Sequence, residues 1–282
     1  MFQPSPCSPN HQAGNRHMTF PTAVDNFRIT HLAETNSTND DVWRAIDEDE
    51  PEGLVVVADQ QLKGRGRQGR SWVTTPEASL AFSILIRPTP GEVHSLSRFS
   101  ALGGLAVRAA IAELSGARPQ LKWPNDVLIN NKKICGILTE AFWEGSHLKG
   151  LIIGIGINIT AASVPNLPSL IYPASSIESE TARVLDRPTL LREVLTHLAA
   201  LRPLLPTDAF IARCNEHLAF RGQVAPVRNN SGEMESFRLI CVDSDGALLV
   251  EDVKGQRQRI YSGELSSPAS SSSLKGSSNS SD

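Results

Sequence analysis

The sequence predicts an α+β protein built from two parts of different size. Patterns typical of helices and strands alternate over residues 25–220, whereas residues 221–266 contain only short strand patterns separated by turns. The chain has 282 residues, 40% of them hydrophobic and 20% charged, so it can bury a large core. We therefore expect one large domain over residues 25–220 and a small antiparallel β-barrel over residues 221–266.

The first part of the chain holds four predicted helices and six predicted strands. A helix is expected to begin after Ser37, because polar capping side chains are followed there by two aspartates. Alanine and leucine at helical spacing predict a long helix over residues 96–114, which ends near Gly116. The third helix is expected over residues 190–205 and a shorter fourth one over 207–218. Apolar, β-branched runs predict strands over residues 54–58, 80–86, 120–123, 127–130, 134–143 and 148–159.

The second part contains four short strand patterns, over residues 223–228, 236–242, 247–251 and 257–261. Asparagine, aspartate, serine and glycine are frequent in the segments between them, at 229–232, 243–246 and 254–255. These residue types favour tight turns, so the strands should pair as antiparallel neighbours.

Both ends of the chain have compositions that cannot form a core. Residues 1–24 are rich in proline, asparagine and histidine, and residues 267–282 are rich in serine, so we expect both to be disordered tails. The net charge of −3 argues against binding nucleic acid through overall charge. No apolar run is long enough to cross a membrane, and neither a secretory signal nor a metal-binding cysteine spacing is visible, so a cytoplasmic location is expected.

A short basic segment is the most informative stretch of the sequence. Lys63, Arg65, Arg67 and Arg70 place four positive charges within eight residues, and no acidic residue lies between positions 59 and 77. Glycines between them allow close approach of the backbone to a ligand, and guanidinium groups match phosphate and carboxylate. The pattern predicts a flexible cationic lid over a small polyanion. A solvated basic loop and an RNA-binding arginine-glycine segment are the alternatives.

A lysine at a strand end is the second candidate. Lys122 lies between two apolar residues and is followed by Pro124, Asn125 and Asp126, so the chain turns abruptly just after it. A buried ammonium needs an anionic or carbonyl partner. Lys122 is therefore a candidate for binding a carboxylate or phosphate; a surface lysine on an edge strand is the alternative.

Alternating glycine and isoleucine mark the third candidate. Gly154, Gly156 and Asn158 follow one another at every second position, so one face of this strand is bare and ends in an amide. A bare face permits close approach of a ligand, although glycine needed only for packing explains the segment equally well. Gly136 gives a similar, weaker indication.

Taken in order, these motifs resemble those of the biotin protein ligases over residues 31–266. The pair of GRGRQGR at 64–70 and KWPND at 122–126 is highly specific for that family. STN at 37–39, KKICGIL at 132–138, GIGIN at 154–158 and SGELS at 262–266 add support through their order and spacing. The resemblance implies a catalytic domain like that of class II aminoacyl-tRNA synthetases, with a mixed sheet, followed by an SH3-like β-barrel.

The resemblance also implies a reaction in two steps. Biotin and ATP, with Mg²⁺, give biotinyl-5′-AMP, and a lysine of a biotin carboxyl carrier protein of acetyl-CoA carboxylase or a related carboxylase then receives the biotinyl group. Arg67 and Lys122 are implied as catalytic residues. The implied biotin-binding residues are Ser37, Thr38, Asn39, Gln61, Arg65, Gly66, Arg67, Lys122, Gly136, Gly154 and Gly156. The implied ATP- and adenylate-binding residues are Arg65, Arg67, Arg70, Trp72, Lys122 and Asn158; no direct protein ligand for Mg²⁺ is expected, although Asn158 should lie near it.

Two departures from the family pattern lead to further expectations. Only about thirty residues of low complexity precede the match, where many bacterial relatives have a DNA-binding helix-turn-helix, so we expect the form without that domain, with no DNA binding and no repressor activity. Lys63 adds charge where relatives more often have a small or neutral residue. A homodimer is compatible with the resemblance. A lipoate or octanoyl transferase and an arginine-glycine nucleic-acid binder are the alternative functions.

Overall fold

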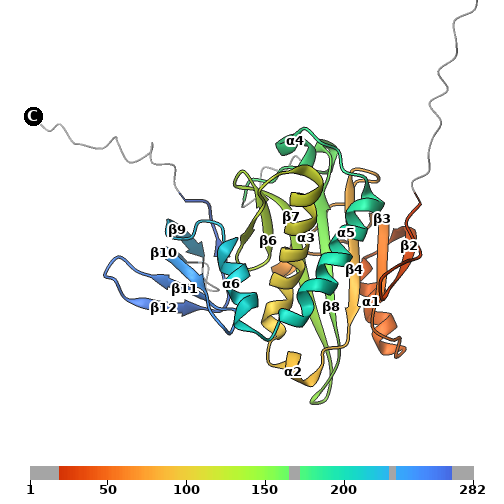
Figure 1. Cartoon of the computed structure of the whole chain (residues 1–282), viewed down its shortest axis with the longest axis horizontal. Coiled ribbons are helices and arrows are strands. Elements are labelled where there is room, and N and C mark those ends of the chain that lie inside the picture. The colour runs from red at the N-terminus through yellow and green to blue at the C-terminus, as the bar shows by residue number, and fades with distance from the viewer. Residues whose placement is uncertain (1–18, 165–171, 229–232, 269–282) are drawn as a thin grey trace, which may run out of the picture.

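The computed structural model describes residues 19–164, 172–228 and 233–268 of the chain. They form a large mixed sheet with helices on both faces and, beside it, a smaller antiparallel sheet (Figure 1). The mixed α+β fold predicted from the sequence is therefore confirmed, as is the presence of an antiparallel sheet near the C-terminus. Within the described residues, no helix is both long and apolar enough to span a membrane.

The large sheet has eight strands in the order β1-β2-β3-β4-β8-β7-β6-β5. Strands β2 and β3 are parallel, and every other neighbouring pair is antiparallel. The register places Gly156 of β8 opposite both Ala81 of β4 and Gly136 of β7, so two glycines lie side by side near the sheet centre. The strands are β1 (Ala23–Val24), β2 (Phe27–Thr35), β3 (Leu54–Gln61), β4 (Ser79–Ile86), β5 (Gln120–Lys122), β6 (Asp126–Ile129), β7 (Lys132–Glu144) and β8 (His147–Asn158).

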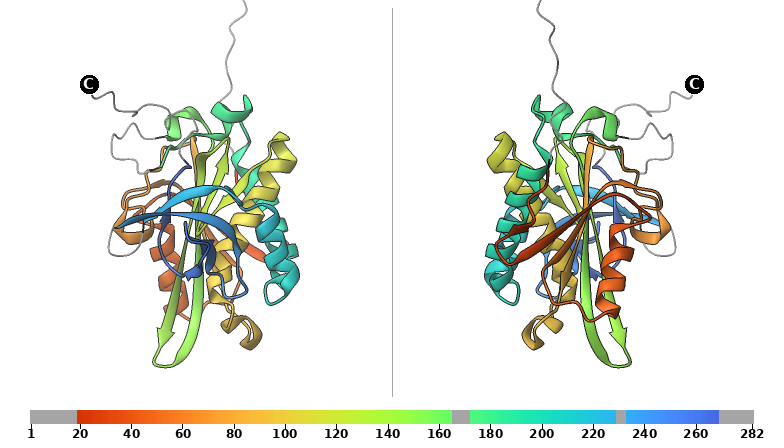
Figure 2. Two further views of the ribbon diagram at one scale, coloured as in Figure 1. Left: turned by 90° about the vertical axis from the view of Figure 1, so that its left-hand side faces the viewer. Right: turned by 90° about the vertical axis from the view of Figure 1, so that its right-hand side faces the viewer.

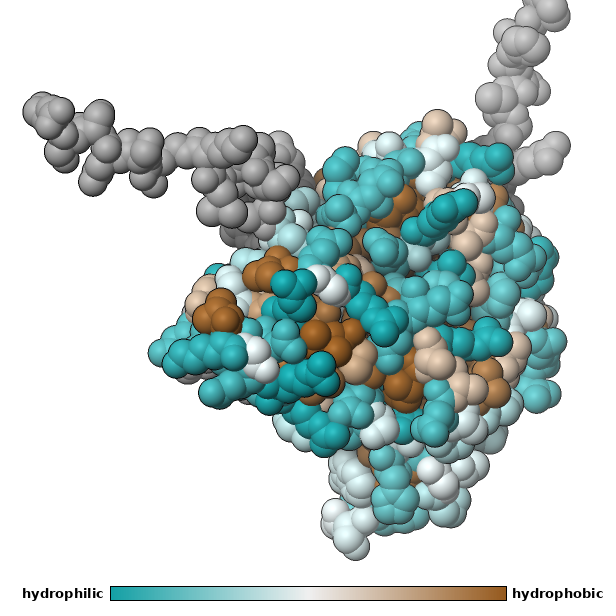
Figure 3. All heavy atoms as spheres, turned by 60° about the vertical axis from the view of Figure 1, so that its left-hand side comes forward, coloured by the Kyte–Doolittle hydropathy of each residue, from teal (hydrophilic) through white to brown (hydrophobic). Residues whose placement is uncertain are grey.

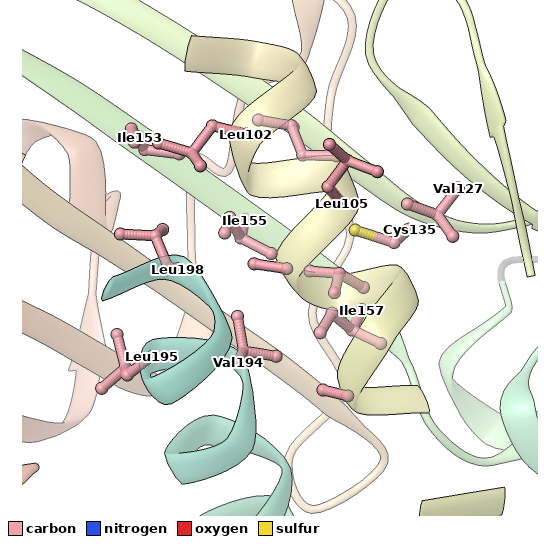
Figure 4. Packing of buried hydrophobic residues seen from close by; sticks show 14 of the residues in the cluster. Leu102, Leu105, Val127, Cys135, Ile153, Ile155, Ile157, Val194, Leu195 and Leu198 are labelled. Atoms are coloured by element: carbon pink, nitrogen blue, oxygen red, sulfur yellow. The ribbon is translucent and has the colours of Figure 1, made fainter. Parts of the chain in front are cut away.

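Helices cover the two faces of this sheet unequally. α1 (Thr38–Asp47) lies on one face, while α3 (Phe99–Ser115) and α5 (Arg187–Leu201) lie together on the other (Figure 2). In β8 the side chains of Ile153, Ile155 and Ile157 point toward α3 and α5 and form the core with their leucines and valines (Figure 4), whereas Ile152 packs on the opposite face with α1. α3 ends at Gly116, whose φ of 74° lies in the left-handed region that glycine adopts without strain. The remaining α-helices are α2 (Pro90–Val93), α4 (Ile177–Thr181) and α6 (Asp208–Glu216).

The smaller sheet has five antiparallel strands in the order β12-β11-β10-β9-β13. Its buried side chains form a second hydrophobic cluster, which Trp123, Leu128 and Tyr172 join from the larger part. Trp123 Nε1 also donates a hydrogen bond to the Gly246 carbonyl at 3.1 Å. The exposed face of this region is mostly hydrophilic with separate hydrophobic patches (Figure 3). The strands are β9 (Val224–Arg228), β10 (Met234–Val242), β11 (Leu248–Glu251), β12 (Arg257–Ile260) and β13 (Glu264–Leu265).

The structure corrects the sequence prediction at the N-terminal side. Residues 23–24, which we assigned to the disordered tail, form β1 and pair with Phe27 and Arg28 of β2. β2 itself was not predicted, because most of its side chains are exposed or half-buried and it lacks a clear apolar alternation. Residues 19–22 and 267–268 of the predicted tails are described and belong to no helix or strand, whereas residues 1–18 and 269–282 and the predicted turn at 229–232 lie outside the described residues. The domain boundaries at 220 and 266 stay predictions.

Candidate functional site

A cavity of about 420 Å³ brings together segments that are far apart in the sequence. The N-terminal end of α1, the loop between β3 and β4, the turn between β5 and β6, the centres of β7 and β8, and β13 all contribute to its wall. Of the predicted site residues, Thr38 does not line this cavity. The others do: Ser37, Asn39, Gln61, Arg65, Gly66, Arg67, Arg70, Trp72, Lys122, Gly136, Gly154, Gly156 and Asn158.

Polar groups at the start of α1 form one end of the cavity. Ser37 is the N-cap of the helix, but its hydroxyl makes no capping hydrogen bond. Asn39 is fixed on both sides, because its Nδ2 donates to Glu140 at 2.5 Å and its Oδ1 accepts from Ser83 at 2.5 Å. Thr38 acts from behind the wall: its backbone N–H and its hydroxyl both donate to Gln61 Oε1, at 2.9 and 3.1 Å.

The bare face of β8 is occupied by side chains of the cavity wall. A Cβ at position 154 would lie 2.2 Å from Asn39 Oδ1, and one at position 156 would lie 2.3 Å from Trp72 Cε2. The glycines therefore make room for Asn39 and for the indole of Trp72, which then lines the cavity itself. The contacts at Gly154 and Gly156 are therefore those of the alternative interpretation, in which the glycines are needed for packing. Trp72 Nε1 is buried and has no hydrogen-bond partner among the described residues.

The three arginines of the basic loop contact three different parts of the protein. Arg65 pairs with Asp40 of α1 at 2.7 Å and lies 3.6 Å from Glu140 of β7. The hydrogen bond that Arg65 donates to Asp40 is the main reason that the pKa of Arg65 is raised. Arg67 Nη1 donates to Asn125 Oδ1 at 3.4 Å, and burial lowers the pKa of Arg67. Both arginines therefore line the cavity from the loop.

The third arginine connects the loop to the smaller sheet. Arg70 Nη1 lies 2.6 Å from Glu264 Oε1, and the Glu264 side chain is only 11% exposed. Glu264 belongs to β13, so the segment that follows the smaller sheet's other strands closes one side of the cavity.

Two lysines share one buried carboxylate at the cavity wall. Lys122 Nζ lies 2.9 Å from Asp126 Oδ2, and Lys133 Nζ lies 2.7 Å from Oδ1. Burial opposes ionisation of Asp126, but the charges of Lys133 and Lys122 outweigh it and lower its pKa to about 2. We call Lys122, Asp126 and Lys133 the Asp126 cluster; with all three ionised it carries a charge of +1.

The two lysines differ in their access to the cavity. The Lys122 side chain is 2% exposed, whereas that of Lys133 is 24% exposed. Lys133, Tyr172 and Glu264 line the cavity but were not among the predicted site residues. Lys133 and Glu264 lie within the KKICGIL and SGELS motifs, which was a usable signal. Nothing in the sequence around Tyr172 indicates a site.

The opposite end of the cavity is formed by the end of β8. Asn158 is buried, and its Nδ2 donates to the Ser175 carbonyl at 3.0 Å. Its amide oxygen remains as a neutral ligand of the kind that Mg²⁺ accepts. In the part of the chain that the structure describes, no three histidine, cysteine, aspartate or glutamate side chains form a metal-binding group. A second cavity of about 240 Å³ adjoins the first, and both are lined by Arg67, Lys122, Asn125 and Asp126.

Known proteins share sequence and fold with this chain. The model of the biotin/lipoate A/B protein ligase family matches residues 32–158. The bifunctional ligase/repressor BirA of Bacillus subtilis is 30% identical over 233 residues, which cover 82% of this chain and 71% of the relative. The biotin–[acetyl-CoA-carboxylase] ligase of Paracoccus denitrificans is 31% identical over 245 residues, covering 83% of this chain and 98% of that protein.

Solved structures give the same result. The biotin protein ligase from Aquifex aeolicus in complex with biotin and ATP superimposes with a TM-score of 0.71 at 28% identity, over 84% of this chain and 97% of that one. A point mutant of the same enzyme in complex with biotin gives a TM-score of 0.70 at 27% identity, over 86% of this chain and 98% of that one. The chain therefore belongs to the biotin/lipoate A/B protein ligase family, among its biotin protein ligases.

Proposed function

We propose that this biotin ligase joins biotin to AMP and then transfers the biotinyl group to a lysine of a biotin carboxyl carrier protein. The observation that carries the proposal is the single cavity that unites the start of α1, the arginine loop and the Asp126 cluster. The Aquifex structure contains biotin and ATP, and the Paracoccus relative is named for acetyl-CoA carboxylase, which supports these substrates and this acceptor.

In the first step a carboxylate oxygen of biotin attacks the α-phosphorus of ATP, the new O–P bond forms, and pyrophosphate leaves with the electrons of the old bond. Anionic groups must approach one another for this to happen, so fixed positive charge is the main requirement. Arg65, Arg67 and Arg70 would supply it from the loop, and Lys133 from β7. Mg²⁺ would come bound to the phosphates and would neutralise their charge, and the Asn158 amide oxygen could serve it as a neutral ligand.

We assign different roles to the two lysines of the Asp126 cluster. Lys133 is the more exposed, so it would bind the biotin carboxylate and the phosphate directly. Lys122, which the sequence resemblance implied as the catalytic lysine, is nearly fully buried against Asp126. It would act mainly through its charge, which leaves the Asp126 cluster with a net charge of +1 beside the substrate.

The remaining residues would bind the two ends of the adenylate. Ser37, Asn39 and Gln61 offer hydroxyl and amide groups for the ureido ring of biotin, and Thr38 would position Gln61. Trp72 would cover the adenine; among the described residues its indole N–H has no hydrogen-bond partner. Gly66, Gly136, Gly154 and Gly156 would complete the pocket wall.

In the second step the acceptor amine attacks the acyl carbonyl, the C–N bond forms, AMP leaves and the amine loses a proton. The adjoining cavity meets the first one at Arg67, Lys122 and Asp126, where the acyl phosphate would lie. We propose that the acceptor lysine enters through this second cavity. The proposal includes a cytoplasmic location and two domains, over residues 25–220 and 221–266. It also holds that the protein acts as a ligase and not as a repressor.

The test is direct. The purified chain is incubated with ATP, Mg²⁺ and biotin, with lipoate in a parallel sample, and acyl-AMP is measured by mass. Biotinyl-AMP should form with biotin only, and adding a biotin carboxyl carrier domain should convert it to biotinylated carrier. Formation of lipoyl-AMP alone, or of no acyl-AMP, would refute the proposal. Arg67→Ala should let the intermediate escape into solution, which a filtration assay would detect.

A further inference from the structure

One line of contacts in the cavity wall joins two aromatic rings through three charged groups. The Tyr172 ring centroid lies 4.6 Å from Lys122 Nζ, which is 2.9 Å from Asp126. Asp126 is in turn 2.7 Å from Lys133 Nζ, which lies 5.9 Å from the ring of Trp72. The line therefore runs from a tyrosine that has no assigned role to the lysine that faces the substrate.

Tyr172 is well placed to act on both lysines. Its side chain is 6% exposed and belongs to the hydrophobic cluster of the smaller sheet, so the ring cannot easily move away. Burial raises the pKa of Tyr172 to about 12, so the ring that faces Lys122 is a neutral phenol. The residues after it run along β7: the Lys133 N–H donates to the Pro173 carbonyl at 2.8 Å, and the Ser175 N–H donates to the Lys133 carbonyl at 2.9 Å.

The Tyr172 ring matters because the two lysines of the Asp126 cluster have only one carboxylate between them. Lys122 and Lys133 compete for one carboxylate, and Lys122, at 2% exposure, has almost no water to stabilise its charge. The face of an aromatic ring attracts a cation, most strongly where water is excluded. Stabilisation that Lys122 does not obtain from the ring must come from Asp126, and this leaves Lys133 less well held.

We propose that Tyr172 is a positioning residue for biotin adenylation: its ring holds Lys122, so that Asp126 remains free to hold Lys133 at the substrate. The inference rests on the proposed function of the cavity. It assigns to Tyr172 an effect on the rate of adenylation that acts through Lys122, in addition to its packing against the smaller sheet.

The test changes the electronic character of the ring while keeping its shape. Tyr172 is replaced by phenylalanine and, through nonsense suppression, by pentafluorophenylalanine, whose face no longer attracts cations. We expect Tyr172→Phe to form biotinyl-AMP within about twofold of the wild-type rate and the fluorinated variant to lose about tenfold in kcat/KM, most of it in kcat. Equal rates in the two variants would overturn the proposal, because packing alone does not distinguish them.

A double-mutant cycle then locates the effect. In a Lys122→Met background, the change from phenylalanine to pentafluorophenylalanine should no longer alter the rate of adenylation, measured in single turnover with enzyme in excess. An undiminished tenfold loss in that background would show that the ring does not act through Lys122, which would also overturn the proposal. Wild-type protein serves as the control: if it forms no biotinyl-AMP, the proposed function fails and not this inference alone.

Discussion

Gly154→Ala should disturb the cavity wall in a way that the structure specifies atom by atom. The new methyl carbon would lie 2.2 Å from Asn39 Oδ1, so Asn39 must move. Moving it breaks its hydrogen bonds with Ser83 and Glu140, which costs about 1 kcal/mol each, and residual overlap adds about 1–3 kcal/mol. We therefore expect the free energy of unfolding to fall by about 3–5 kcal/mol. If Asn39 binds biotin, the KM for biotin should rise by about tenfold or more.

Urea unfolding and biotinyl-AMP formation measure the two effects separately. Asn39→Ala removes the obstructing amide, so adding Gly154→Ala in that background should cost almost nothing more. Gly91→Ala is the matched control, because no atom lies within 4 Å of its added methyl group. The reasoning is refuted if the free energy of unfolding of Gly154→Ala lies within about 0.5 kcal/mol of the wild-type value and the variant binds biotin normally.

Four more changes test other parts of the site. Lys133→Met should reduce pyrophosphate release by about 100-fold or more and should also lower the thermal stability, because the buried Asp126 then keeps only Lys122 as a positive partner. In Arg70→Glu, the new carboxylate should repel Glu264, so the enzyme should lose adenylate to solution. The double variant Arg70→Glu, Glu264→Arg should retain the adenylate again. The pKa of Asp126 is about 2, against 3.8 unperturbed, so its ionised form contributes about 2 kcal/mol of stability above pH 3.8, and this is lost as the pH falls through 2. In Asp126→Asn, the loss of stability at acid pH (the acid limb), measured by urea unfolding, should be smaller. Thr139→Trp should block the second cavity and slow transfer to the carrier, but not adenylation.

Each of these expectations has a result that contradicts it. Normal adenylation by Lys133→Met would return the catalytic role to Lys122. A swapped Arg70–Glu264 pair that leaks as much adenylate as the single variant would show that the contact is incidental. An unchanged acid limb in Asp126→Asn would mean that other carboxylates dominate there. Equal loss of both half-reactions in Thr139→Trp would place its effect in the first cavity.

The sequence predicted most elements of the fold because their patterns are strongly periodic. The glycine-isoleucine alternation of β8 and the alanine-leucine pattern of α3 follow directly from which side chains are buried. The sequence did not predict β2, because this strand is mostly exposed or half-buried and lacks an apolar alternation. It did not predict β1 and β13 either, because a strand of two residues has no periodic pattern. Their places in the sheets depend on pairing with distant strands, which local patterns do not record.

The candidate site was predicted in outline but not in its charge balance. Motifs identified the lid arginines and Lys122, because charge and glycine in a short segment are visible in the sequence. The exposure of Lys133 relative to Lys122 follows from how β5, β6 and β7 meet, and Tyr172 comes from a segment with no motif. Which of two lysines faces a substrate is a property of the folded chain.

The ion pair between Arg70 and Glu264 joins the arginine loop to β13 of the smaller sheet. A chimera that carries the terminal strands of a distant relative could keep both hydrophobic clusters intact and still leave the arginine loop without its anchor. On the proposed function, such a hybrid would fold but would release biotinyl-AMP. This mixed anhydride would then react with nearby amines of any protein. On the proposed function, retention of the adenylate would therefore depend in part on β13.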